Sequence, residues 1–218
     1  MINWARLFRL RPFFSYGGVF MFQVALGVTI PSSEKLKEEF QIFENSILFN
    51  LSFEKLESFI TEFIEQLVEP LFFVLEMPLT RQEEDELRVN SQSPFHKKVC
   101  YLDGQSREQI MSILNTYGDL LLNDGMSQFA IYSHNTNDGV YIQKYKVIVI
   151  FSHTPQKYIS LLEKNGVVQT DSIFTAWDTF SQDSPGQVQK IEMDGIDIFD
   201  VYDELVKMGM YIAKVVED

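Results

Sequence analysis

Cysteine is almost absent from this 218-residue sequence, which contains a single copy, Cys100. One thiol excludes an intrachain disulfide and a zinc site built from several cysteines. Cys100 lies within the apolar run VCYL, and this context favours a buried, unreactive thiol over a nucleophile.

The sequence also lacks the short motifs on which many nucleophilic, nucleotide-binding and metalloprotease sites are built. It contains no GxSxG, GxGxxG, GxxxxGKS/T or HExxH pattern. If residues 140–151 form one extended strand, His134 and His153 lie at its opposite ends, roughly 36 Å apart at about 3.3 Å per residue. His96 is followed by two lysines, a poor setting for a cation. We therefore predict no metal site, no cofactor and no catalytic residue, and the sequence favours a binding protein over an enzyme.

Basic residues are scarce, with 18 Lys and Arg against 31 Asp and Glu and a net charge of −13. This balance argues against nucleic acid and anionic membranes as partners. Residues 1–31 contain three arginines and no acid, which leaves a charge of −16 on residues 32–218. An acidic body of this kind favours solubility or a basic partner.

Large apolar residues are plentiful, at 45% of the sequence with 19 Phe, as in an ordinary globular domain. They alternate with smaller residues between positions 20 and 30, which predicts a strand with one buried face. We therefore expect an N-terminal arm over 1–19 and one globular domain over 20–218. Two alternatives remain for this region: a secretory signal ending at Ala25-Leu26-Gly27, or a native start at Met21, which would make residues 1–20 foreign.

Further along the chain, helical and strand patterns are interleaved. The clearest helix begins after Ser52 as N-cap and stops at Pro70, and capping boxes at Thr80 and Ser106 begin two more. The remaining predicted elements are a short helical piece over 32–43, helices over 154–166 and 197–208, and strands over 71–78, 97–102, 126–133, 140–151, 187–193 and 210–216. The chain is thus predicted to be α+β (mixed α/β), a single domain with a largely antiparallel sheet packed against several amphipathic helices.

Four Asp-Gly pairs, at Asp103, Asp124, Asp138 and Asp194, fall at predicted element boundaries. This placement is typical of turns, where glycine supplies the positive φ. Asp124 is the one pair member that merits inspection as a site, because its loop begins the strand that leads to His134.

Two segments are candidate binding surfaces. The acidic run Glu83-Glu84-Asp85-Glu86 is either a surface for a basic partner or a solvated first helical turn. The segment SIFTAWDTFSQDSPGQ combines aromatic and small polar groups, which suits an interface anchor or a pocket wall, although packing in the core is the alternative. Its candidate residues are Trp177, Asp178, Thr179 and Asp183.

These observations lead to three functional hypotheses. The first is a soluble, cytoplasmic, acidic protein-binding module that masks a basic partner, as an immunity protein or antitoxin does. The second is a small-ligand-binding protein or enzyme with a pocket around Trp177–Asp183. The third is a structural, self-associating protein.

Overall fold

A nine-stranded sheet organises the chain, and a computed structural model describes it over residues 22–218. Its strands lie in the order β11-β5-β4-β6-β7-β8-β3-β2-β9, and every pair is antiparallel except β2 with β9. The strands are β2 (Glu39–Phe43), β3 (Ser46–Phe49), β4 (Leu71–Pro78), β5 (His96–Gln105), β6 (Gln128–Ser133), β7 (Gly139–Ile142), β8 (Ile148–Phe151), β9 (Val168–Gln169) and β11 (Tyr211–Glu217). A separate two-stranded ladder joins β1 (Val28–Thr29) to β10 (Gln187–Val188).

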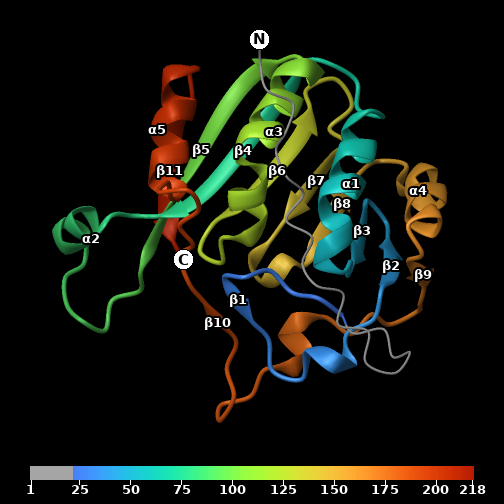
Figure 1. Ribbon diagram of the computed structural model, residues 1–218, viewed down its shortest axis with the longest axis horizontal. Helices are drawn as coiled ribbons and strands as arrows, with labels where there is room; N and C mark the ends of the chain where they lie inside the picture. The colour runs from blue at the N-terminus through green and yellow to red at the C-terminus, as the bar shows by residue number, and fades with distance from the viewer. Residues whose placement is uncertain (1–21) are drawn as a thin grey trace.

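Helices cover one face of this sheet. The five α-helices are α1 (Phe53–Ile64), α2 (Arg81–Leu87), α3 (Arg107–Asn123), α4 (Ile159–Lys164) and α5 (Ile198–Lys207). In Figure 1, α1, α3 and α5 lie in front of the strands, whereas α2 projects away from the body. The predicted α+β class with a largely antiparallel sheet is therefore confirmed.

Phenylalanine fills the core between the helices and the sheet. The fully buried rings are Phe40, Phe49, Phe59, Phe63, Phe73 and Phe129. The ring centroids of Phe49 in β3 and Phe59 in α1 are 5.0 Å apart, so this pair joins a strand to a helix. The centroids of Phe73 in β4 and Phe129 in β6 are 5.7 Å apart, so this pair joins two strands. Cys100 is fully buried as predicted, and burial raises the pKa of its thiol to about 11.

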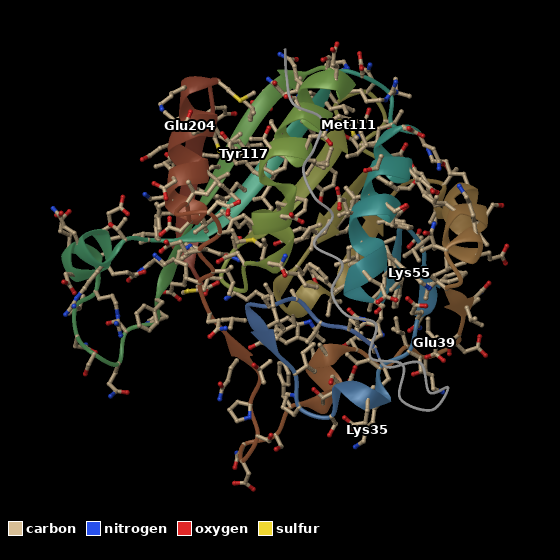
Figure 2. The ribbon with its side chains drawn as sticks, in the orientation of Figure 1. Lys35, Glu39, Lys55, Met111, Tyr117 and Glu204 are labelled. Carbon is tan, nitrogen blue, oxygen red and sulfur yellow. The ribbon has the colours of Figure 1, made fainter. Side chains whose placement is uncertain are left out.

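Local capping signals in the sequence set several helix starts. The capping boxes at Thr80 and Ser106 form as predicted, and Asp197 begins α5 in the same way. Ser52 precedes α1, but its hydroxyl accepts the Gln23 N–H at 3.0 Å instead of capping the helix. Lys55 of α1, labelled in Figure 2, contacts Glu38 at 2.5 Å and the Asn165 carbonyl at 3.1 Å, which ties α1 to the start of β2 and the end of α4.

Three predicted elements are wrong, and the predicted strand over 187–193 is reduced to β10 at Gln187–Val188. The predicted strand over 20–30 is reduced to Val28–Thr29 within the described residues, and the alternation fails because Leu26 is 50% exposed while Ala25 is buried. Gly27 explains this: its backbone lies so close to Gly125 that an added Cβ would stand 2.4 Å from the Gly125 nitrogen. Around Gly27 the chain therefore contacts other backbone segments at single points and does not form a continuous strand. The predicted arm over 1–19 lies outside the described residues.

The other two errors concern the sheet. The helical piece over 32–43 is a short 3-10 turn followed by strand β2. Residues 140–151 are not one strand, because the turn at 144–146 folds β8 back antiparallel to β7. Tyr145 and Lys146 both have φ near +57° in this turn. His134 and His153 therefore follow strand ends on the same side, and the separation expected from one extended strand is wrong.

A buried hub at Asp124 joins distant parts of the chain. Its carboxylate accepts the backbone N–H groups of Ser127 at 2.7 Å, Met126 at 3.1 Å and Ile191 at 3.0 Å. The buried Lys146 ammonium donates to the Asp124 carbonyl at 2.7 Å. Asp124 thus fixes the turn into β6 and anchors the segment before α5, which gives it a structural role.

The other Asp-Gly pairs also mark turns, with one correction. Gly104 and Gly195 have positive φ, as predicted, but Gly125 and Gly139 do not, and in the β6–β7 hairpin the positive φ belongs to Asn137. Gly139 is needed for a different reason. An added Cβ there would lie 1.9 Å from the ring of Tyr132, its partner across the strands, so glycine lets this ring lie flat against β7.

We expect the pH dependence of stability to change when Lys146 is replaced by Met. Burial lowers the pKa of the Lys146 ammonium from 10.5 to about 8, against the attraction of Asp124. Between these two values the unfolded chain binds more protons than the folded one, so stability rises with pH. From pH 7 to pH 9, urea unfolding should show wild type gaining about 1 kcal/mol relative to Lys146→Met. A constant difference between the two proteins over this range would contradict the assignment.

Candidate functional site

The most prominent surface feature is a finger, residues 79–95, that connects β4 to β5 and carries α2. In Figure 1 it extends away from the sheet beside the β11 edge. The Thr80–Glu83 capping box begins α2, with the Glu83 carboxylate 2.9 Å from the Thr80 nitrogen. The finger is therefore an ordered projection with a defined helix.

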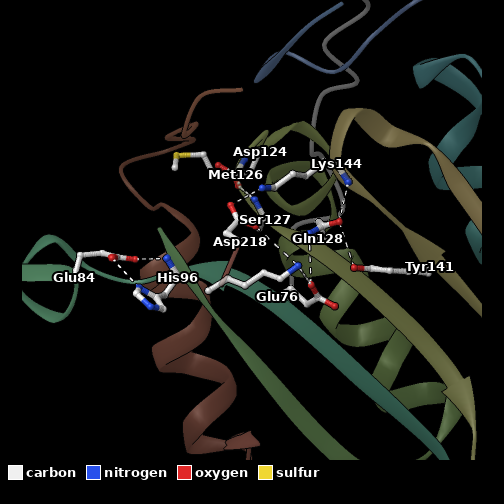
Figure 3. A network of polar contacts seen from close by, with 11 residues as sticks. Glu76, Glu84, His96, Asp124, Met126, Ser127, Gln128, Tyr141, Lys144 and Asp218 are labelled. Carbon is white, nitrogen blue, oxygen red and sulfur yellow. Dashed lines mark hydrogen bonds and ion pairs between the residues drawn. The ribbon is translucent and has the colours of Figure 1, made fainter. Parts of the chain in front are cut away.

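Acidic residues at the base of the finger hold it to the sheet. Glu84 is buried and accepts the His96 backbone N–H at 2.6 Å, with its second oxygen 3.2 Å from His96 Nδ1 (Figure 3). Glu83 forms an ion pair with Lys98 at 2.7 Å. Burial raises the pKa of Glu83, but hydrogen bonds from Lys98 and Thr80 outweigh it and lower the pKa overall. The interpretation of the whole run as a solvated turn is thus wrong for Glu84, which the sequence could not distinguish from its neighbours.

The outer part of the finger combines acid with apolar surface. Asp85 and Glu86 are exposed, and they lie next to three exposed apolar side chains: Leu87, Val89 at 90% and Phe95 at 61%. Arg88 stiffens this end, because its guanidinium donates to the Ser91 and Ser93 carbonyls at 2.9 and 2.8 Å and lies 4.1 Å from the Phe95 ring centroid.

A second candidate surface is the sheet face opposite the helices. Its small residues Val74, Val99 and Ala130 are buried beneath larger side chains. The Phe72 ring lies 5.9 Å from Tyr101, 5.2 Å from Tyr132 and 4.6 Å from His134. Next to this aromatic layer is an open hollow of about 360 Å³. It is lined by Val74, Glu76, Lys97, Val99, Tyr101, Ala130, Tyr132, Tyr141, Lys214, Val216 and Glu217.

Charged and polar groups close one end of this hollow. Glu76 pairs with Lys97 at 2.7 Å, and the Tyr141 hydroxyl donates to Gln128 Oε1 at 3.2 Å (Figure 3). Burial raises the pKa of Tyr132 and Tyr141, and the negative charge of Glu76 adds to the effect. Both phenols therefore stay protonated at neutral pH and act as hydrogen-bonding groups rather than as bases.

The segment around Trp177 lies elsewhere on the molecule. Trp177 is 45% exposed and packs edge-on against Tyr145 and Phe180, at 4.8 and 5.6 Å between ring centroids. Asp178 is exposed but accepts the Thr175 backbone N–H at 2.7 Å, while Thr179 donates to the Ala176 carbonyl at 2.6 Å.

Asp183 is exposed beyond this short helical turn. The structure thus gathers Trp177, Asp178 and Thr179 in one turn, and it does not bring them to the acidic finger, which lies on another side of the molecule (Figure 1).

Comparison with known protein families, with curated proteins and with solved structures finds no match to this chain. Within residues 22–218, no group of three His, Cys, Asp or Glu side chains is arranged to hold a metal ion. No helix in the described part of the chain has the length and apolar character needed to cross a membrane.

The aromatic sheet face was missed at the level of sequence. Residues 71–78, LFFVLEMP, are apolar except for Glu76, and they predict a buried strand. In the structure Phe72 and Glu76 point to the open face, while Leu71, Phe73 and Leu75 are buried under the helices. The sequence signal that could have revealed the open face lies in the next strand, where every second residue, Lys97, Val99 and Tyr101, shares one face.

We expect Glu84→Ala to loosen the finger, because it leaves the partly buried His96 N–H without an acceptor. The cost should be about 1–3 kcal/mol. Limited proteolysis should show faster cleavage within residues 88–95, and urea unfolding should show the loss of stability. Glu86→Ala is the matched control, since that carboxylate is exposed. Equal cleavage rates in the two variants would contradict a supporting role for Glu84.

Proposed function

We propose that the protein is a protein-binding module that docks on a basic partner through its finger. The observation that carries this proposal is the pairing of exposed Asp85 and Glu86 with exposed Leu87, Val89 and Phe95 on one ordered projection. Apolar side chains supply contact area at a protein interface, and adjacent charges select the sign of the partner.

The charge of the whole chain supports the same partner. The −16 charge of residues 32–218 attracts a basic protein over distances beyond direct contact, which speeds association at low salt. Masking a basic protein in this way is what an immunity protein or antitoxin does. Glu83 is engaged in its ion pair with Lys98 and Glu84 is buried, so the outer residues of the finger are the ones left to meet the partner.

The test is capture from source lysate at low and high salt, using the chain and a finger variant that carries Asp85→Lys and Glu86→Lys. We expect one basic protein to be retained at low salt by wild type, with at least tenfold less retained by the finger variant and by wild type at high salt. The control carries Glu54→Lys and Glu57→Lys on exposed positions of α1, an identical change of charge.

Retention that falls equally in the finger variant and the α1 control would show that net charge alone acts and that the finger is not the docking surface. If wild type retains no basic protein at low salt, the proposal is wrong. Folding of every variant is checked by circular dichroism.

A small-ligand function is the second candidate. The hollow on the open sheet face is a better site for such a ligand than the segment near Trp177, where the carboxylates are exposed. Its aromatic walls and the exposed Lys214 suit a planar ligand bearing a carboxylate. We expect aromatic carboxylic acids such as benzoate or naphthoate to raise the Tm of wild type, and to raise that of Lys214→Glu less. Thermal shifts that are equal in the two proteins, or absent, would exclude this use of the hollow.

A further inference from the structure

The two edges of the nine-stranded sheet are built differently. At one end β9 has only two residues, Val168–Gln169, so little backbone is left free there. At the other end β11 runs for seven residues, Tyr211–Glu217, and pairs with β5 on one side. Within the described part of the chain, no strand lies on its other side. A long edge of this kind presents N–H and C=O groups ready to pair with another strand.

Exposed apolar side chains are concentrated at this edge. Among the described residues, the last 13 positions supply five of the 16 large exposed hydrophobics: Tyr211, Ile212 and Val215 on β11, and Val206 and Met208 at the end of α5. Ile212 and Val215, each 44% exposed, lie opposite Cys100 and Lys98 on β5. Their strand register places both on the helix-covered side, at the rim of the core. An apolar rim beside a free strand edge marks an interaction surface.

The charge of the strand indicates which partner fits it. β11 contains one lysine, Lys214, and one acid, Glu217, so it is neutral within a chain of net charge −13. A basic protein finds no excess of acid on this strand. Two identical neutral strands, by contrast, approach each other without local repulsion, even though the chains as a whole are acidic.

We infer that β11 pairs antiparallel with β11 of a second copy about a two-fold axis, which joins the two sheets into one. An edge-to-edge contact between identical strands is isologous and closes as a dimer. The register shift between Ile212 and Lys214 limits regular pairing to the second half of the strand. The two-fold then passes at Val215, where the two exposed valine side chains meet. This inference does not depend on the proposed function.

Sedimentation equilibrium of the full chain across micromolar concentrations tests the dimer. We expect wild type to dimerise and Val215→Lys to weaken the dimer at least tenfold, because two facing ammonium groups repel. Val168→Lys, on the exposed β9 edge, is the matched control and should dimerise like wild type. A monomeric wild type, an unchanged Val215→Lys, or an equal loss in Val168→Lys would each overturn the inference.

A cysteine at the two-fold gives a second readout that does not depend on affinity. Val215→Cys should form a disulfide-linked dimer on mild oxidation, since cross-strand side chains lie within disulfide reach. Cys100 is fully buried and does not interfere. Val168→Cys should remain uncrosslinked. A dimeric Val215→Cys protein that fails to crosslink would overturn the placement of the two-fold at Val215.

Discussion

The structure depends on a sheet that is covered by helices on one face only. Burial of apolar area beneath α1, α3, α4 and α5 supplies the main driving force for folding, and the large rings of Phe59, Phe63 and Phe73 fill that layer. The opposite face has no helix in the described part of the chain. It is shielded by its own aromatic side chains, so Val74, Val99 and Ala130 are buried beneath Phe72, Tyr101 and Tyr132. One-sided coverage thus creates both the core and the aromatic hollow.

The Asp124 hub holds the rest of the chain to this sheet. Three backbone N–H groups converge on one buried carboxylate, and the Lys146 ammonium satisfies the carbonyls of Asp124 and Leu121 at 2.7 and 3.4 Å. Buried polar groups are tolerated when they are hydrogen-bonded to this extent. The segment before α5 is fixed by the hub, and α5 in turn leads directly into the edge strand β11. The hub thus fixes the segment that leads through α5 to β11, and pairing with β5 sets the position of the free edge.

Sequence patterns predicted those elements whose signals are local. Capping boxes at Thr80 and Ser106 depend on side chains three residues apart, and they marked the starts of α2 and α3 correctly. The strand over 71–78 and the final strand were likewise predicted, because short apolar runs between turns are local features. These are also the elements that frame the finger and the edge.

Patterns failed where contacts distant in sequence decide the conformation. The alternation over 20–30 would suit a strand, but Gly27 packs against the backbone of Gly125 and leaves Leu26 exposed. The end of α1 is another example: the helix stops at Ile64, six residues before Pro70, and Arg107 binds the carbonyls of Ile64 and Leu67 at 3.2 and 2.7 Å. Glu84 is buried only because β5 begins beside it at His96. No pattern within a single segment contains this information.

The two proposed interfaces lie on the same side of the molecule and differ in charge. The finger and β11 are adjacent, since Glu217 lies opposite His96 and the Asp218 N–H donates to the Phe95 carbonyl at 2.8 Å. The finger carries exposed acids, whereas β11 is neutral. A surplus of acid repels an identical chain and attracts a basic one, and a neutral strand does neither. The acidic finger thus matches the basic partner that we propose for it, and the neutral edge matches the second copy that we propose there.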